Sequence, residues 1–373
     1  MGEGSYDTYM EEREYWLGFS VFPGIGPKRF QNLITAFTTA ENAWNASESE
    51  LKNVLGEVLT DKFIAFRNTF SYDEYEEKLA KNQVTFLTSF DSSYPSPLSS
   101  LSNPPFVLYV KGESDVNSFM QQNVIAVVGT RRITSYGRQV TEMITRDLVG
   151  SGCVIVSGLA MGVDTVAHQV TLNNGGKTIA VLGCGVDCCH PTVNQRLYQD
   201  IISSGGTILS EFPLQQAPSK GSFPSRNRII AGLSQAIVVT EGTEDSGALI
   251  TAKDAFTCQR KVFAVPGPVT SRLSRGPNSL LSKGAILATS AEDIMEEMGI
   301  KARKEEKQHK TKVFGETEEE QKIIDILENE RLLFDEIVRR TDLISSTVGT
   351  LLSLMEIKGI VKQDSTHTYF LAE

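Results

Sequence analysis

An aromatic ring, two guanidinium groups and an amide are concentrated between residues 222 and 228, in the sequence SFPSRNR. Arginine matches the geometry of a phosphate group, and an exposed aromatic ring can stack on an unpaired base. Phe223, Arg226, Asn227 and Arg228 could therefore hold a nucleic-acid strand. A structural role is the alternative, in which Phe223 belongs to the core and the arginines bridge loops.

A second group of candidate residues lies in the sequence VGTRR at 128–132, which follows an apolar run and precedes an amphipathic helical pattern. Free amides at a helix N-terminus attract anions, and Arg131 adds a positive charge. The segment lacks the second and third glycines of a dinucleotide fingerprint. A glycine turn alone is weak support for a ligand, because tight turns in α/β domains need glycine whatever they bind.

Asp164 and His168 are four residues apart, the spacing of neighbours on one face of a helix. They could act as an acid–base pair. Alternatively, they could hydrogen-bond and fix the preceding turn structurally, and this is the interpretation we favour.

Thiol and imidazole groups cluster in Cys184, Cys188, Cys189 and His190. These residue types are zinc ligands. Three of them are consecutive, however, and the cluster lacks the CxxC spacing that lets chelating side chains converge. We therefore expect no metal site.

The elements that position these residues begin with a strand–turn–helix–strand unit. Apolar runs at 154–156 and 179–182 predict two buried strands, and the glycine-bearing turn at 157–162 leads into a helix between them. Such a βαβ unit closes right-handed into a parallel sheet and presents its turn at the carboxyl edge, where ligands bind.

The same alternation continues along the chain, with further short apolar strands at 124–128, 207–209, 236–239 and 262–265. It predicts an α/β fold, a Rossmann-like, doubly wound and mostly parallel sheet covered by helices on both faces. We assign this domain to residues 72–300.

The two ends of the chain predict separate modules. Residues 1–71 are helical, and their FPGIGPK turn resembles a helix-hairpin-helix, although a bundle turn without a ligand is the favoured interpretation. Residues 301–315 form a basic linker. Residues 316–373 predict three helices, the second opening at 332, and a hairpin around Asp364-Ser365, which together make a winged helix. Because this module is acidic and residues 346–356 carry no cation, protein contact is favoured over DNA reading.

Net charge is −10, and residues 1–110 and 316–373 each contribute −7. A local basic cleft in the middle domain is therefore compatible with an acidic protein. No long apolar run or signal peptide occurs, so we expect a cytoplasmic location and no membrane contact. The five cysteines are expected to be reduced.

Six motifs in this order resemble the DprA/Smf family of DNA-processing proteins over residues 80–295. They are VGTRR at 128–132, SGLAMGVDTVAH at 157–168, GKTIAVLGCGVD at 176–187, FPSRNRIIAGLS at 223–234, SGALITAKDA at 246–255 and VFAVPG at 262–267. One departure is Cys188-Cys189-His190-Pro191, because the family commonly has an aromatic residue before this proline.

The resemblance implies a non-enzymatic protein that binds and protects single-stranded DNA, forms a homodimer and helps to load the RecA recombinase during natural transformation. No cofactor is implied. The DNA contacts that it implies come from Gly129, Thr130, Arg131, Ser157, Gly158, Ala160, Gly162, Arg196, Phe223, Arg226, Asn227, Arg228, Ser246, Gly247 and Lys283.

Two other functions remain open at this point. A nucleotide-hydrolysing enzyme of the phosphoribohydrolase type would use Glu241 in EGTEDSG as its carboxylate, although the usual PGGxGT signature is missing. A winged-helix regulator that senses a nucleotide is the third hypothesis.

Overall fold

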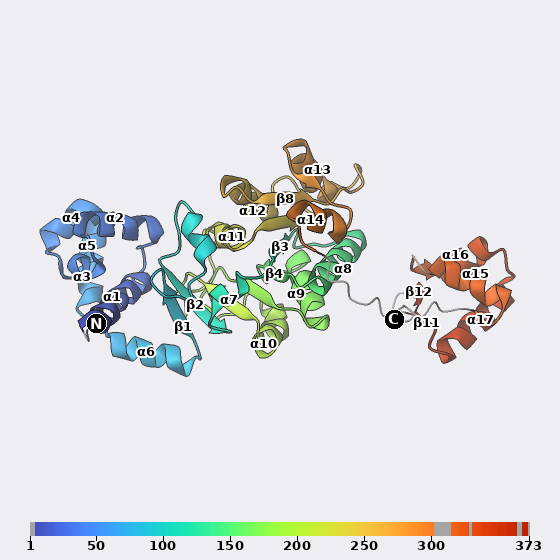
Figure 1. Cartoon of the computed structure of the whole chain (residues 1–373), viewed down its shortest axis with the longest axis horizontal. Coiled ribbons are helices and arrows are strands. Elements are labelled where there is room, and N and C mark those ends of the chain that lie inside the picture. The colour runs from blue at the N-terminus through green and yellow to red at the C-terminus, as the bar shows by residue number, and fades with distance from the viewer. Residues whose placement is uncertain (1–3, 302–314, 328–329, 364–367, 372–373) are drawn as a thin grey trace. The chain divides into compact units, whose positions relative to one another are not determined.

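The computed structural model describes residues 4–301, 315–327, 330–363 and 368–371, with side chains from residue 12 onward. The chain divides into two compact units, residues 1–303 and 304–373 (Figure 1). The expected helical region and the expected sheet domain both fall in the first unit. The expected basic linker lies outside the described residues, except for its two end positions.

Six helices form the N-terminal part of the first unit: α1 (Gly4–Val21), α2 (Pro27–Phe37), α3 (Ala40–Asn45), α4 (Glu48–Leu55), α5 (Glu57–Arg67) and α6 (Tyr72–Lys81). Three of them, α3, α4 and α6, start at a side chain that accepts from a backbone amide of the first turn. For example, the Ser47 hydroxyl accepts from the Glu50 amide and the Glu50 carboxylate accepts from the Ser47 amide, which closes a capping box at α4. The predicted FPGIGPK turn joins α1 to α2, and there the Arg29 side chain donates to the Gly24 carbonyl at 2.7 Å.

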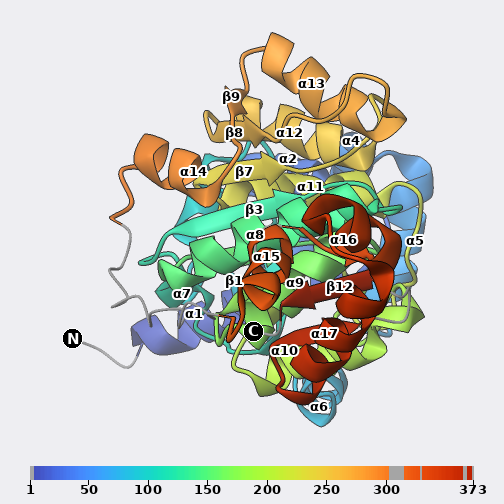
Figure 2. The same cartoon turned by 90° about the vertical axis from the view of Figure 1, so that its right-hand side faces the viewer.

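A nine-stranded sheet fills the middle of the unit, in the order β1-β2-β6-β5-β4-β3-β7-β8-β9. The strands are β1 (Thr85–Thr88), β2 (Val107–Gly112), β3 (Val124–Val128), β4 (Val154–Ser157), β5 (Thr178–Val181), β6 (Thr207–Ser210), β7 (Ala236–Val239), β8 (Lys261–Ala264) and β9 (Ile286–Leu287). β1 pairs with β2, and β2 with β6, in antiparallel fashion, whereas the other pairs are parallel. Figure 2 shows β7, β8 and β9 following one another outward from β3.

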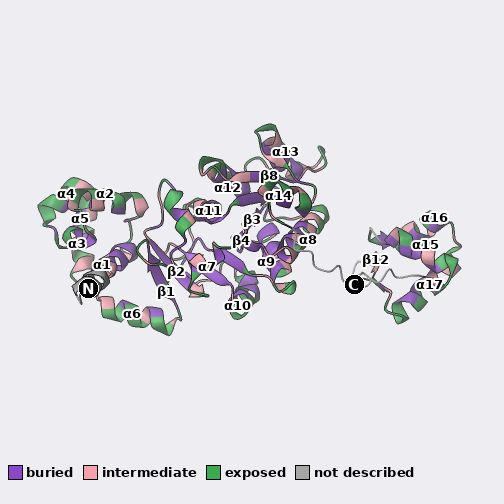
Figure 3. Ribbon diagram, viewed as in Figure 1, coloured by how far each residue is buried: buried purple, intermediate pink, exposed green. Residues whose placement is uncertain are grey.

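Side chains alternate between the two faces of the sheet, and each face has its own helices. Val124 and Ala126 pack with α11 (Ser222–Leu233) and α12 (Gly247–Thr257). Ile125 and Val127 pack with α8 (Ser135–Gly150), α9 (Val163–Asn173) and α14 (Ala291–Met298). The remaining helices of the unit are α7 (Val116–Phe119), α10 (Gln195–Ser203) and α13 (Arg275–Ser282). Figure 3 shows the strands buried between these helical layers. The predicted doubly wound, mostly parallel fold is confirmed.

The chain reverses direction across the sheet between β3 and β7. β3, β4, β5 and β6 succeed one another toward one edge, and the chain then returns through α11 to place β7 on the other side of β3. In such a sheet the loops that follow neighbouring strands diverge at this point, which leaves a crevice at the carboxyl edge. The fold therefore puts the turns after β3, β4 and β7 around one crevice.

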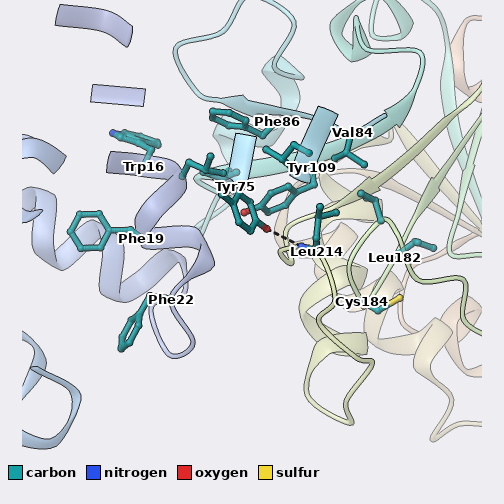
Figure 4. Close-up of a cluster of buried hydrophobic side chains, with 14 of the residues drawn as sticks. Trp16, Phe19, Phe22, Tyr75, Val84, Phe86, Tyr109, Leu182, Cys184 and Leu214 are labelled. Atoms are coloured by element: carbon teal, nitrogen blue, oxygen red, sulfur yellow. Dashed lines mark hydrogen bonds between the residues drawn. The ribbon is translucent and has the colours of Figure 1, made fainter. Parts of the chain in front are cut away.

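One apolar core continues from the N-terminal helices into the sheet (Figure 4). It contains buried hydroxyl groups that have partners: Tyr109 lies 2.6 Å from the Ser20 hydroxyl, and Tyr75 accepts from the Leu214 amide at 3.1 Å. Buried polar groups without partners cost free energy, so these bonds restrict how the helices can pack on the sheet. The N-terminal helices are thus built into the first unit rather than tethered to it.

Two side chains of α9 fix the turn that follows β4. Asp164 accepts from the amides of Gly158 (3.1 Å) and Ala160 (3.4 Å), and His168 Nε2 accepts from the Leu159 amide at 3.3 Å. His168 Nδ1 lies 2.7 Å from Thr178 Oγ1, which donates onward to a β4 carbonyl. The structural role that the sequence favoured is therefore present, although each side chain bonds to the turn and not to the other side chain.

The second unit is a winged helix, as predicted. It consists of α15 (Glu318–Leu327), β10 (Leu332–Leu333), α16 (Phe334–Thr341), α17 (Ser345–Ile357), β11 (Val361–Gln363) and β12 (Thr368–Leu371). The helix expected to open at residue 332 begins two residues later, because Leu332 and Leu333 pair with β12 as a strand. The exposed residues of α17 include Thr350, Leu354, Glu356 and Ile357, and none of the exposed residues of this helix is a cation. The expected turn at Asp364-Ser365 lies outside the described residues.

Burial, followed by the positive charge of Arg226, lowers the pKa of His168 to about 3. We predict that His168→Gln lowers the free energy of unfolding by about 1–3 kcal/mol near neutral pH, because a buried donor or acceptor loses its partner. The difference in unfolding free energy between wild type and variant should shrink as the pH falls from about 6.5 toward about 3. In that range the unfolded wild-type chain binds a proton that the folded chain excludes, so the wild-type advantage declines.

Urea unfolding followed by tryptophan fluorescence measures this effect in the first unit, because Trp16 and Trp44 both belong to it. A difference between wild type and variant that is as large at about pH 5 as at neutral pH would contradict a neutral, hydrogen-bonded His168.

Candidate nucleic-acid interface

Two adjoining hollows lie at the carboxyl edge of the sheet and share Arg131, Ala160, Phe223 and Arg226 in their walls. We call them together the cleft. The larger hollow has a volume of about 370 Å³, which falls within the range of about 300–1,000 Å³ for ligand pockets. Ten of the fifteen predicted site residues line the cleft: Gly129, Thr130, Arg131, Gly158, Ala160, Phe223, Arg226, Asn227, Ser246 and Gly247.

Three loops are joined by backbone hydrogen bonds on one side of the cleft. The Thr130 amide donates to the Glu241 carbonyl at 2.7 Å, and the Val163 amide donates to the Thr130 carbonyl at 3.1 Å. Gly162 has a φ of +81°, and a side chain there would collide with the Thr130 carbonyl. Gly162 thus contributes to the site by allowing these loops to approach one another, and it does not line the cleft.

Arg131 is an exposed cation in the wall of the cleft. Its guanidinium carbon lies 4.9 Å from the centre of the Phe223 ring, in a cation–π contact. Within the described residues no carboxylate forms an ion pair with Arg131. The charge of this guanidinium is therefore free to meet an anion.

Arg226, by contrast, is only 5% exposed. Its Nη1 donates to the Val181 carbonyl at 2.6 Å, and the guanidinium covers Gly158 so closely that any side chain at that position would collide with it. The buried carboxylate of Asp164 provides the nearby negative charge. Arg226 thus forms the floor of the cleft, where it contributes positive potential.

Asn227 and Arg228 are held by protein groups. Asn227 Nδ2 donates to the Gly247 carbonyl at 3.2 Å, which ties α11 to the start of α12. Arg228 is paired with the largely buried carboxylate of Glu211 and lies outside the cleft walls. Arg228 therefore has the structural role that was the alternative to a DNA contact.

The other three predicted residues also lie outside the cleft walls. The Ser157 hydroxyl is buried and donates to the Val127 carbonyl at 2.7 Å, which ties β4 to β3. Arg196 is exposed on α10, with its Nε 3.9 Å from Asp200. Lys283 is exposed just after α13. A contact between these two cations and DNA remains a prediction.

Several residues that line the cleft were not among the predicted site residues, and Met161, His190 and Lys220 are three whose side chains could contact a strand. Lys220 is exposed and precedes Phe223 by three residues, so a basic residue beside the SFPSRNR segment was the available signal. His190 was considered only as a metal ligand. In the structure its ring lies 5.8 Å from the ring of Phe223, at a tilt of 41°.

Glu241 is the residue that the hydrolase alternative would use as its catalytic carboxylate. It is buried, and both of its oxygens already accept hydrogen bonds. Its two oxygens accept from the Thr134 amide at 3.0 Å and from the Thr134 hydroxyl at 2.6 Å. Thr134 is the N-cap of α8, so the carboxylate stabilises the start of that helix. Glu241 lines neither hollow of the cleft.

The thiols beside the cleft remain free, and no group of three or more potential ligands could hold a metal ion in the described part of the chain. Cys184 Sγ lies 3.1 Å from the Cys188 carbonyl. Burial raises the pKa of Cys184 to about 12 and that of Cys189 to about 11. Both groups are therefore neutral thiols at physiological pH. Among the described helices, none has the length and apolar character needed to cross a bilayer.

Comparison with known proteins covers both units. The family model for DNA recombination-mediator protein A matches residues 85–299, and the model for the DprA winged helix domain matches residues 307–365. Protein Smf of a Synechocystis species is 40% identical over 291 residues, which are 77% of this chain and 73% of that protein.

Two solved structures are similar in fold and sequence. The X-ray structure of DprA from Streptococcus pneumoniae has a TM-score of 0.65 at 33% identity, over 76% of this chain and 97% of that chain. DprA from Helicobacter pylori, whose structure is described as having a unique single-stranded DNA binding mode, has a TM-score of 0.52 at 32% identity, over 58% of this chain and 95% of that chain. With its motifs in order and its sheet and winged helix in place, this chain belongs to the DprA/Smf family of DNA recombination-mediator proteins.

Proposed function

We propose that this chain binds single-stranded DNA in the cleft at the carboxyl edge of its sheet. The observation that carries the proposal is the exposed guanidinium of Arg131, which has no ion-pair partner among the described residues and lies over the Phe223 ring. Lys220 in the same wall adds a second exposed cation, and the buried Arg226 adds positive potential from below. Phosphates need such cations, and an unpaired base needs an aromatic surface.

A single strand suits this cleft better than a duplex does. Phe223 is half-buried, and it is flanked by Met161 and His190 in the walls of the smaller hollow. Bases in a duplex are stacked on one another and cannot reach an aromatic ring inside a pocket without being flipped out, which costs a few kcal/mol each. Preference for the single strand therefore follows from the recessed position of the ring.

Arg131→Ala should weaken binding of a single-stranded oligonucleotide about tenfold, which corresponds to about 1.4 kcal/mol. The slope of log affinity against log salt concentration should also become shallower by about 0.7, because one fewer counterion-releasing phosphate contact forms. Fluorescence anisotropy over a series of salt concentrations measures both quantities.

Arg138→Ala is the matched control, because Arg138 is an exposed arginine of α8 that lines neither hollow and lies 3.6 Å from Glu142. It should leave affinity and salt slope unchanged. Equal behaviour of the two variants would remove Arg131 from the binding site. Equal affinity of the wild type for single-stranded and duplex DNA would contradict the role of the recessed ring.

We further propose that the chain acts without hydrolysing nucleotides. The argument rests on Glu241, whose carboxylate oxygens both accept hydrogen bonds at the start of α8 and which stands outside the cleft walls. Incubation with nucleoside monophosphates should therefore release no free base, as chromatography of the mixture would measure. If the wild type releases free base and Glu241→Gln does not, the phosphoribohydrolase alternative is correct instead.

The proposal extends to cytoplasmic loading of RecA on DNA taken up in natural transformation, by a homodimer, as the family resemblance implies. If this is so, the chain should shorten the lag of RecA filament formation on single strands already covered by a single-strand-binding protein. Arg131→Ala should lose this effect in proportion to its loss of DNA affinity, whereas Arg138→Ala should keep it. Analytical ultracentrifugation measures the oligomeric state. A monomeric chain, or a RecA lag that the wild type leaves unchanged, would contradict this part of the proposal.

A further inference from the structure

His190 occupies the wall of the smaller hollow together with Phe223, Arg131 and Arg226. Its side chain is exposed, and within the described residues no protein group hydrogen-bonds to either ring nitrogen. The imidazole can therefore offer its N–H groups to a ligand in the hollow. This contrasts with His168, both of whose ring nitrogens have protein partners.

The groups that face His190 carry only positive charge or none. Arg131 from the loop after β3 and Arg226 from α11 supply two guanidinium groups. The loop after β4 contributes Gly158, Ala160 and Met161, which are uncharged. No carboxylate lines this hollow among the described residues. A protonated His190 would thus add a third cation to a wall with no negative charge, and an anionic ligand would favour that protonation.

We propose that His190 is a DNA-contacting residue whose protonated imidazole pairs with a phosphate of the bound strand. This inference rests on the proposed function, because it requires the strand to occupy the cleft. Histidine can change its charge within the physiological pH range, whereas phosphodiester and guanidinium groups keep their charges across it. Binding of single-stranded DNA should therefore strengthen as the pH falls through this range.

The direction of the effect follows from linkage. A bound phosphate favours the charged form of the imidazole, so DNA and a proton bind cooperatively. Affinity should increase about three- to sixfold between about pH 8 and about pH 6. Among the other groups near the cleft, the pKa of His168 is about 3, and those of Cys184 and Cys189 are about 12 and about 11. Burial also raises the pKa of Asp164 in the wall of the larger hollow, and the His190→Gln variant keeps that group unchanged.

The test uses the full chain and an oligonucleotide without terminal phosphates, so that only the protein titrates. Affinity is measured by anisotropy at constant ionic strength from about pH 8 to about pH 6, the interval that spans the titration of an imidazole. His190→Gln keeps a hydrogen-bonding side chain but cannot gain a proton, and it should bind with nearly the same affinity throughout. His190→Lys carries a constant charge, and it should bind at about pH 8 roughly as tightly as the wild type does at about pH 6.

The outcomes separate this inference from the proposed function. If the wild type binds single strands with no pH dependence, or if His190→Gln keeps the full dependence, His190 is not the titrating contact, although the cleft can still be the DNA site. If the wild type binds no single-stranded DNA at any pH, both proposals are wrong. His190→Phe retains the ring contact with Phe223, so a pH dependence that is lost in both the Gln and Phe variants would identify the proton, and not the packing, as the cause.

Discussion

The cleft depends on the burial of one guanidinium group. Arg226 leaves α11, donates to the end of β5 and covers Gly158 after β4, with the Asp164 carboxylate of α9 nearby. A charge removed from water costs several kcal/mol unless an opposite charge and hydrogen bonds compensate it. Asp164 supplies that charge and also accepts from the Gly158 amide. The same arrangement therefore keeps Arg226 buried, fixes the turn after β4 and orients α11, one turn of which separates Arg226 from Phe223.

The N-terminal helices are linked to the cleft through contacts with the segment between β6 and α11. The hydroxyl of Tyr75 in α6 accepts from the Leu214 amide (Figure 4). The next amide, that of Gln215, donates to Asp187 at 3.0 Å. Residue 216 in turn accepts from the Gly185 amide at 3.0 Å. The segment that carries Lys220 to the cleft is thus held between an N-terminal helix and the turn after β5. This explains why the helices share a core with the sheet instead of forming a separate body.

The sequence predicted the fold well because periodicity reports local burial. β-Branched runs separated by amphipathic helices predict a parallel sheet, and the strands lie where these runs occur. It predicted for the same reason that the candidate residues would gather at one edge of the sheet, where ten of them line the cleft. It could not show that Arg226 is buried while Arg131 is exposed, because both are arginines in short polar stretches and only tertiary packing separates them. Nor could it place His190, whose contact with Phe223 joins residues 33 positions apart.

In the proposed binding mode, the contact with a base and the contact with a phosphate meet at the Phe223 ring. The Arg131 guanidinium covers one face of the ring, with its central carbon 4.9 Å from the ring centre. A base can stack on that face only after the guanidinium has moved away, and a phosphate is the partner that would attract it. Loss of Arg131 would therefore remove a charge and uncover an aromatic surface at the same time, and these two changes act on affinity in opposite directions. The salt dependence of binding responds only to the charge, so it reports on the phosphate contact more directly than affinity does.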